Sequence, residues 1–310
     1  MDKNARQFYV FTLLVGAYLL FVFLTHPDHA LLAYYHLSVA QYRGIVATVI
    51  IPLVVIWYLA FYGFTKLQSY SQMIYKNKDG HYVRWLKEGV MILAFQLPLV
   101  ALANAILKYA AVNDRHFDSG AVIISHYISL AFPLIAFICI GYGTRGLTEI
   151  VKARPSLRAI YIMAASFIVI GTAFTYFVFK GVPNTDLVTH PLNQAVYDLP
   201  NWALLITIVM PYVFMWFAGL LGAYELYLYG RKTPGIVYRR SWNLLALGCG
   251  WIILTSICTQ YLTALAGHID ILKINALLIV IYSLLILLAG GYLLLALGAK
   301  KLQRIEEVFA

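Results

Sequence analysis

Eight long apolar stretches alternate with short polar stretches along the 310-residue chain. A helix crosses the hydrocarbon core of a bilayer with about 20 apolar residues, and each stretch comes close to that length. None of them contains an Asp or a Glu. The pattern predicts an all-α fold, a polytopic membrane bundle of about eight transmembrane helices. In chain order, segments one to eight cover residues 8–25, 45–64, 90–112, 121–142, 160–180, 202–224, 244–266 and 275–299.

The composition agrees with this pattern. Hydrophobic residues make up 62% of the chain and charged residues 12%, whereas a soluble domain has about 25% charged residues. The connections between the apolar segments are too short to hold a separate soluble domain. The sequence therefore predicts a single transmembrane domain over residues 1–310.

The basic residues are distributed unevenly between the two predicted sides of the membrane. Of the 23 Lys and Arg residues, 18 lie before segment one, after segments two, four and six, and in the C-terminal tail. This positive-inside pattern places both termini in the cytoplasm, and we expect an integral protein of a prokaryotic plasma membrane. The net charge of +10 is then a topology signal, and without a basic domain we expect no nucleic-acid partner. Expected partners are the lipid bilayer and other membrane proteins or copies of this chain.

A short motif recurs at the end of each even-numbered segment: an aromatic residue, Gly six positions later, Leu four after that, then Tyr or Ile. It predicts four repeated helical hairpins over 1–76, 77–155, 156–232 and 233–310. Pro52 and Pro211 also fall at corresponding positions. The alternative is that aromatic residues gather at membrane interfaces in any case. A glycine lets a second helix approach closely, so we expect helix packing at Gly63, Gly143, Gly222 and Gly298.

Polar residues within the apolar segments are concentrated in the odd-numbered ones. Such groups turn away from lipid to find partners, so we expect odd segments to line the interior and even segments to face lipid. The polar residues either line a solute path or form interhelical contacts, and these two interpretations stay open. The candidates are Gln96, Asn104, His126, Thr172, Thr175, Thr255, Thr259 and Gln260.

Histidines recur in the predicted outer loops, each with an Asp close by. If these loops converge, His with Asp can bind Zn²⁺ or Cu²⁺ or respond to protons. The alternative is an ordinary hydrated role at the membrane surface. The candidate metal ligands are His26, His29, His116, His190 and His268. His126 has no second histidine at matching depth, so no haem is expected, and a metal at the outer loops is the one cofactor considered.

The chain lacks phosphate-binding glycine loops, a nucleophile elbow and paired carboxylates within the apolar segments. We therefore expect a non-enzymatic membrane protein that passes or binds a small neutral or lipid-like solute. The alternatives are a non-catalytic scaffolding subunit of a larger membrane complex and a sensor or receptor-like membrane protein.

Overall fold

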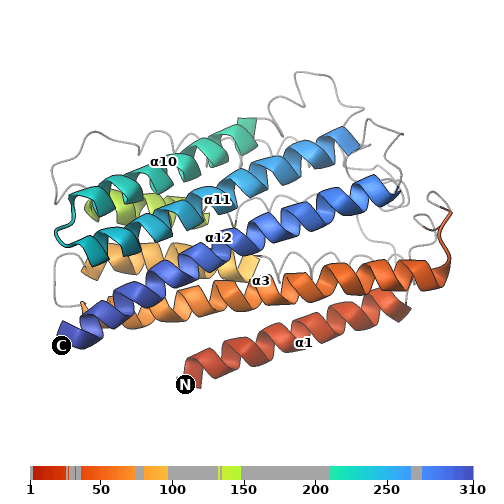
Figure 1. Cartoon of the computed structure of the whole chain (residues 1–310), viewed down its shortest axis with the longest axis horizontal. Helices are drawn as coiled ribbons and strands as arrows, with labels where there is room; N and C mark the ends of the chain where they lie inside the picture. Colours follow the sequence, from red (N-terminus) through yellow and green to blue (C-terminus); the bar gives the residue numbers. More distant parts are fainter. Residues whose placement is uncertain are drawn as a thin grey trace, which may run out of the picture.

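The computed structural model describes residues 3–25, 27, 32, 36–74, 80–96, 132, 135–147, 210–266 and 274–309. These residues form seven helices and no strand. Five helices carry labels in Figure 1, and two more cover residues 80–96 and Ile135–Leu147. The labelled helices are α1 (Lys3–Thr25), α3 (Val39–Met73), α10 (Met210–Lys232), α11 (Ile236–Ala266) and α12 (Ile274–Phe309).

Helix α3 shows how the sequence sets the start of a long apolar helix. The Ser38 hydroxyl accepts a hydrogen bond from the Gln41 backbone N–H at 3.2 Å, and the Gln41 side chain accepts one from the Ser38 N–H at 2.9 Å. This reciprocal capping box satisfies two N–H groups that have no partner within the helix. The helix then continues for 35 residues, with Pro52 inside it. At 1.5 Å per residue it is about 52 Å long.

The helices form an elongated bundle with their axes roughly along its length (Figure 1). Helix α1 packs on α3, α12 packs on both α3 and α11, and α10 packs on α11. Helix α1 begins and α12 ends toward the same end of the bundle (Figure 1). We call this the C-terminal end of the bundle.

Helices α10 and α11 form an antiparallel hairpin joined by residues 233–235. The Thr233 N–H and hydroxyl both donate to the Tyr229 carbonyl oxygen, at 3.0 and 2.8 Å, and this closes the last turn of α10. Gly235 follows Pro234 with φ +92°, a left-handed conformation that glycine adopts without strain. The turn lies next to the exposed side chains of Arg231 and Lys232.

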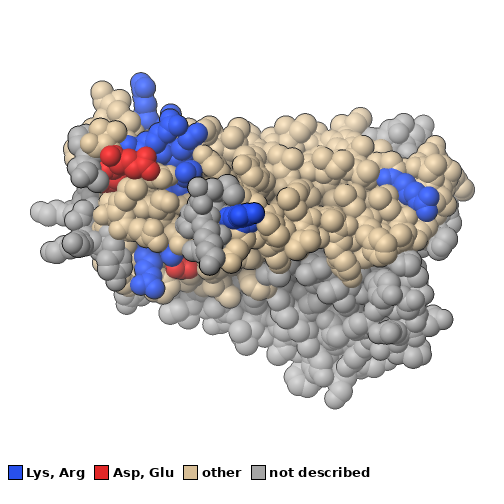
Figure 2. All heavy atoms as spheres, turned by 90° about the horizontal axis from the view of Figure 1, so that it is seen from below, with Lys and Arg blue, Asp and Glu red and all other residues tan. Residues whose placement is uncertain are grey.

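Large apolar side chains cover the outside of the described helices. Examples on five helices are Leu14, Ile51, Phe217, Leu254 and Ile286, which are 49–71% exposed. In Figure 2 the Lys, Arg, Asp and Glu side chains gather mainly toward one end, and a broad uncharged surface separates them from a smaller basic patch near the other end. Exposed apolar surface on this scale marks contact with lipid or with another protein.

Two described helices are long and apolar enough to cross a membrane: α3 (Val39–Met73) and the part of α12 over Ile281–Val308. The prediction of an all-α fold is confirmed for the described residues. The count of about eight spans remains a prediction, because only these two of the described helices qualify as spans, and segment five and parts of segments three, four and six lie outside the described residues.

The interior differs from the simple division into inward odd segments and outward even segments. Side chains of the even segments, among them Trp57, Phe61, Ile140 and Tyr292, are among the most deeply buried, at 0–2% exposed. The even segments therefore bury one face and expose another. The division was predicted from polar residues alone, and these inward faces are almost entirely apolar and aromatic.

Candidate functional site

The first close helix contact joins the helix over 80–96 to the helix Ile135–Leu147. A methyl group at Gly143 would lie 2.6 Å from the Tyr82 carbonyl oxygen and 2.7 Å from the Leu86 nitrogen. From the other side, a methyl group at Gly89 would lie 2.6 Å from the Ala136 carbonyl oxygen. Each glycine therefore lets the backbone of the opposite helix approach, which is the packing that small residues allow between membrane helices.

Helices α11 and α12 make the same kind of contact in the second half of the chain. A methyl group at Gly298 would lie 2.9 Å from both the Ser241 carbonyl oxygen and the Leu245 nitrogen. One at Gly248 would lie 2.9 Å from the Gly291 carbonyl oxygen and 2.6 Å from the Leu295 nitrogen. In this contact the residues of α11 have numbers 159 higher than their counterparts in the first hairpin, and the residues of α12 have numbers 155 higher.

The same numbering offset relates two contacts that cross between the halves of the chain. Gly63 packs on Leu295 and Ala296 of α12. Gly222 packs on Ile140 and Gly141, which are their counterparts in the first half. The first contact is tighter: a methyl group would lie 2.7 Å from a side-chain atom at Gly63, and no closer than 3.5 Å to any atom at Gly222. The second segment thus packs on the eighth, and the sixth packs on the fourth.

The position four residues after each of these four glycines is a leucine in the core. Leu67, Leu147, Leu226 and Leu302 are all 0% exposed. Three residues further on, Tyr70 and Tyr229 again occupy corresponding positions, and both rings contact Trp242 edge-on. Their ring centroids lie 6.1 and 4.9 Å from that of Trp242. This aromatic trio is buried, with exposed fractions of 1–7%, and lies toward the C-terminal end of the bundle.

Two polar contacts lie near this aromatic trio. The buried Thr144 hydroxyl is 3.1 Å from both Glu225 Oε2 and the Gly141 carbonyl oxygen, and so links α10 to the helix Ile135–Leu147. The Tyr238 hydroxyl donates a 2.7 Å hydrogen bond to Glu306 Oε1 between α11 and α12. Partial burial and the neighbouring Glu306 carboxylate raise the pKa of Tyr238 to about 12. Each contact is a side-chain hydrogen bond between two neighbouring helices.

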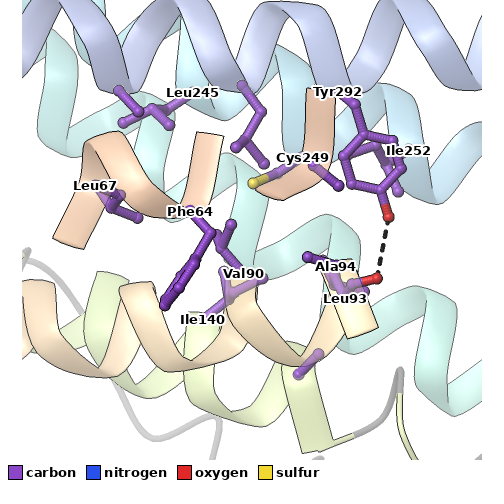
Figure 3. Packing of buried hydrophobic residues seen from close by; sticks show 14 of the residues in the cluster. Phe64, Leu67, Val90, Leu93, Ala94, Ile140, Leu245, Cys249, Ile252 and Tyr292 are labelled. Atoms are coloured by element: carbon purple, nitrogen blue, oxygen red, sulfur yellow. Dashed lines mark hydrogen bonds between the residues drawn. The ribbon is translucent and has the colours of Figure 1, made fainter. Parts of the chain in front are cut away.

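Deeper in the bundle the packing is apolar. Figure 3 shows Phe64, Val90, Ile140, Cys249 and Ile252 within one cluster of buried side chains. The Tyr292 hydroxyl reaches across to the Leu93 carbonyl oxygen, at 3.4 Å (Figure 3). This hydrogen bond joins α12 to the helix over 80–96. The cysteines Cys139 and Cys249 are buried and free, as expected for packing residues.

Trp57 carries a buried hydrogen-bond donor in the second segment. Its side chain is 0% exposed, and within the described part of the chain its indole N–H has no hydrogen-bond acceptor. The residue lies near the middle of segment two. A buried N–H without an acceptor costs free energy, so this position favours any polar group that comes within its reach.

The structure places only part of the predicted polar set. Gln96 is half-buried at the end of the helix over 80–96, and the buried Thr255 hydroxyl donates to its own helix, to the Trp251 carbonyl oxygen at 2.8 Å. Thr259 and Gln260 lie within α11, but their side chains are outside the described residues, as are Asn104, His126, Thr172 and Thr175 altogether. The two described residues are not linked by any hydrogen bond.

The predicted outer histidines His26, His29, His116, His190 and His268 also lie outside the described residues. Within the part that is described, no group of three or more His, Cys, Asp or Glu side chains could hold a metal ion. The outer metal site therefore remains a prediction.

Sequence reasoning missed the glycines Gly89, Gly248 and Gly291 and the pair formed by Thr144 and Glu225. The signal for Gly89 and Gly248 was present, because their spacing equals that of Gly63 and Gly222. Comparisons with protein-family models, with curated proteins and with solved structures find no match to this chain.

Proposed function

We propose that this chain is an integral membrane protein of about eight transmembrane helices that binds or passes a small neutral or lipid-like solute between its helices. The apolar outer faces of the described helices support the membrane placement, because lipid is a suitable solvent for them. The charged residues gathered near the C-terminal end (Figure 2) fit the headgroup region on the cytoplasmic side. Both termini would then lie in the cytoplasm.

The corresponding glycine contacts support a duplicated architecture. Segments one to four and five to eight would form two similar halves, and the crossed contacts of Gly63 and Gly222 are those expected of a two-fold axis between them. Because each half contains an even number of spans, the axis would run along the membrane normal. Many transporters are built from such parallel repeats, with the solute site between the repeats near mid-membrane.

The buried indole N–H of Trp57 carries the solute proposal. It lies near the middle of segment two, and among the described residues it has no acceptor. A neutral solute with a hydroxyl or carbonyl group would supply one. The aromatic trio of Tyr70, Trp242 and Tyr229 would close this site toward the cytoplasm, so solute would enter from the outer side or laterally from lipid.

Stopped-flow light scattering on proteoliposomes tests this function with glycerol and urea as neutral probes. Wild-type protein is expected to speed the equilibration of one probe relative to protein-free liposomes. The variant Trp57→Phe removes the donor but keeps an aromatic side chain, and it should slow that equilibration. Native mass spectrometry of purified protein covers the lipid-like case, since a retained small molecule should be lost in the same variant.

A scaffolding role is the second candidate, and the close apolar packing of the described interior favours it. Four fully buried leucines and a buried aromatic trio fill the C-terminal end, so this end suits a rigid subunit. If neither solute permeation nor a retained molecule is found, and the protein co-migrates in a larger complex after mild extraction, the scaffolding role would replace the solute proposal. A sensor using the outer histidines is the third candidate and would require stoichiometric metal in the purified protein.

A further inference from the structure

Helices α11 and α12 pack against each other along a line of contact residues, which we call the seam. One side of the seam is buried and the other is exposed. The seam itself is formed by Ser241, Leu245, Gly248 and Ile252 on α11 and by Gly291, Leu295, Gly298 and Leu302 on α12, and the glycine contacts and burial define it. Residues one position after a seam residue are mostly buried, including Trp242, Cys249, Ile253, Tyr292, Ala296 and Ala299. Residues one position before are mostly exposed, and they point to the opposite side because successive helical residues are about 100° apart.

The exposed side carries the same pattern on both helices. On α11 it runs from Arg240 through Leu247 to Trp251, and on α12 from Leu293 through Leu297 to Lys301 and Arg304. These spacings of three, four and seven residues keep each series on one helical face. In both series apolar residues lie toward the middle of the helix and cations lie toward the C-terminal end of the bundle. We call this surface the seam stripe.

The three cations of the seam stripe lie at one level of the bundle. Two contacts bracket Arg240 along α11: the hydrogen bond from Tyr238 to Glu306 and the packing of Leu245 on Gly298. The residues of α12 between Gly298 and Glu306 include Lys301 and Arg304, so these two lie opposite Arg240. Lys301 and Arg304 are three residues apart and share a face.

The neighbouring carboxylates are engaged elsewhere. Glu306 accepts the Tyr238 hydrogen bond, and Glu307 Oε1 accepts one from the Gln303 amide at 2.6 Å. The seam stripe therefore presents three exposed cations directly beside exposed Leu297, Leu247 and Trp251, which are 39, 56 and 43% exposed. A ligand that fits must carry a negative charge next to a long apolar part.

We propose that the seam stripe is a binding site for one anionic phospholipid of the cytoplasmic leaflet, whose phosphate contacts Arg240, Lys301 and Arg304. Its acyl chains lie along Leu297, Leu293, Leu247 and Trp251. Basic residues at the cytoplasmic ends of membrane helices attract anionic headgroups, and Arg matches phosphate geometry with two parallel hydrogen bonds. The site rests on the proposed membrane placement, but it does not depend on any solute passing through the bundle.

The test uses the full chain reconstituted into phosphatidylcholine vesicles that contain brominated phosphatidylglycerol or, separately, the same amount of brominated phosphatidylcholine. Bromine quenches the fluorescence of a nearby tryptophan, and the difference between wild type and Trp251→Phe isolates the signal of Trp251. We expect phosphatidylglycerol to be preferred at least about fivefold, the preference that a single surface cation can supply. The triple variant Arg240→Gln, Lys301→Gln, Arg304→Gln should lose the preference.

A matched triple variant, Arg84→Gln, Arg231→Gln, Lys232→Gln, removes the same charge from exposed positions outside the stripe and should keep the preference. If both triple variants lose the preference for phosphatidylglycerol equally, a general surface potential explains it and the site is overturned. If neither variant loses the preference, the site is overturned as well. Displacement of the brominated lipid by soluble glycerol 3-phosphate would overturn the lipid assignment in favour of free phosphate. Carbonate extraction of wild-type membranes checks the membrane placement separately, and the quenching result is independent of glycerol or urea permeation.

Discussion

Gly143 and Tyr82 lie so close that a methyl group on Gly143 would stand 2.6 Å from the Tyr82 carbonyl oxygen. The counterpart pair in the second half, Gly298 and Ser241, would bring the same two groups to 2.9 Å. Backbone atoms cannot rotate away as the end of a side chain can. The two hairpins therefore depend on glycine at these positions to hold their helices together.

This relationship predicts that Gly143→Ala destabilises the protein by about 1–3 kcal/mol, because the added methyl forces two backbones apart. Gly222→Ala is the matched control from the same motif. Its methyl would come no closer than 3.5 Å to any atom, and alanine favours a helix over glycine by about 1 kcal/mol. Thermal unfolding in detergent, monitored as the loss of the monodisperse peak, should show a lower midpoint for Gly143→Ala and no lowering of the midpoint for Gly222→Ala. Equal midpoints for the two variants would mean that the close contact is incidental.

Two adjacent glycines in α12 give an independent comparison. A methyl at Gly291 would lie 2.8 Å from the Ile252 side chain and 3.2 Å from its nitrogen, whereas one at Gly290 would meet only Trp251 Nε1 at 3.8 Å. We expect Gly291→Ala to lower the thermal midpoint and Gly290→Ala to leave it unchanged or raise it. The two variants have the same composition and nearly the same helix propensity, so the difference reports only the α11 contact. A destabilising Gly290→Ala would contradict the assigned face of α12.

The helices could be predicted from the sequence because long apolar segments leave few alternatives to a helix. The recurrence of Gly63, Gly143, Gly222 and Gly298 is also visible in the sequence, and in the structure these four glycines lie buried at helix contacts. Their partners could not, because Leu295 or Tyr82 is an ordinary helix residue until the helices are placed side by side. The polar pair formed by Thr144 and Glu225 escaped for the same reason: each residue looks unremarkable within its own segment.

The direction of the chain across the membrane is testable at two exposed residues. Ala40, at the start of α3, is predicted to lie outside, and Lys232, at the turn between α10 and α11, is predicted to lie in the cytoplasm. In intact cells an impermeant thiol reagent should label Ala40→Cys and should label Lys232→Cys only after the membrane is opened. A Cys258→Ala background removes one native thiol, and Cys139 and Cys249 are buried. Labelling of Lys232→Cys in intact cells would show that the chain has the opposite orientation across the membrane.

The hydrogen bond from Tyr238 to Glu306 predicts a specific loss of stability at alkaline pH. Tyrosine in an unfolded chain titrates near pH 10, and the folded protein raises the pKa of Tyr238 to about 12 by partial burial and by the adjacent Glu306 carboxylate. A raised pKa means that folding favours the protonated phenol, so its contribution is fully present below about pH 10 and is lost as pH rises toward about 12. The thermal midpoint of wild type should therefore exceed that of Tyr238→Phe by a constant amount at neutral pH, and the gap should shrink between these two values. Subtracting Tyr238→Phe at each pH removes the contribution of the other tyrosines, and a gap that stays constant through this range would show that folding does not raise the pKa of Tyr238.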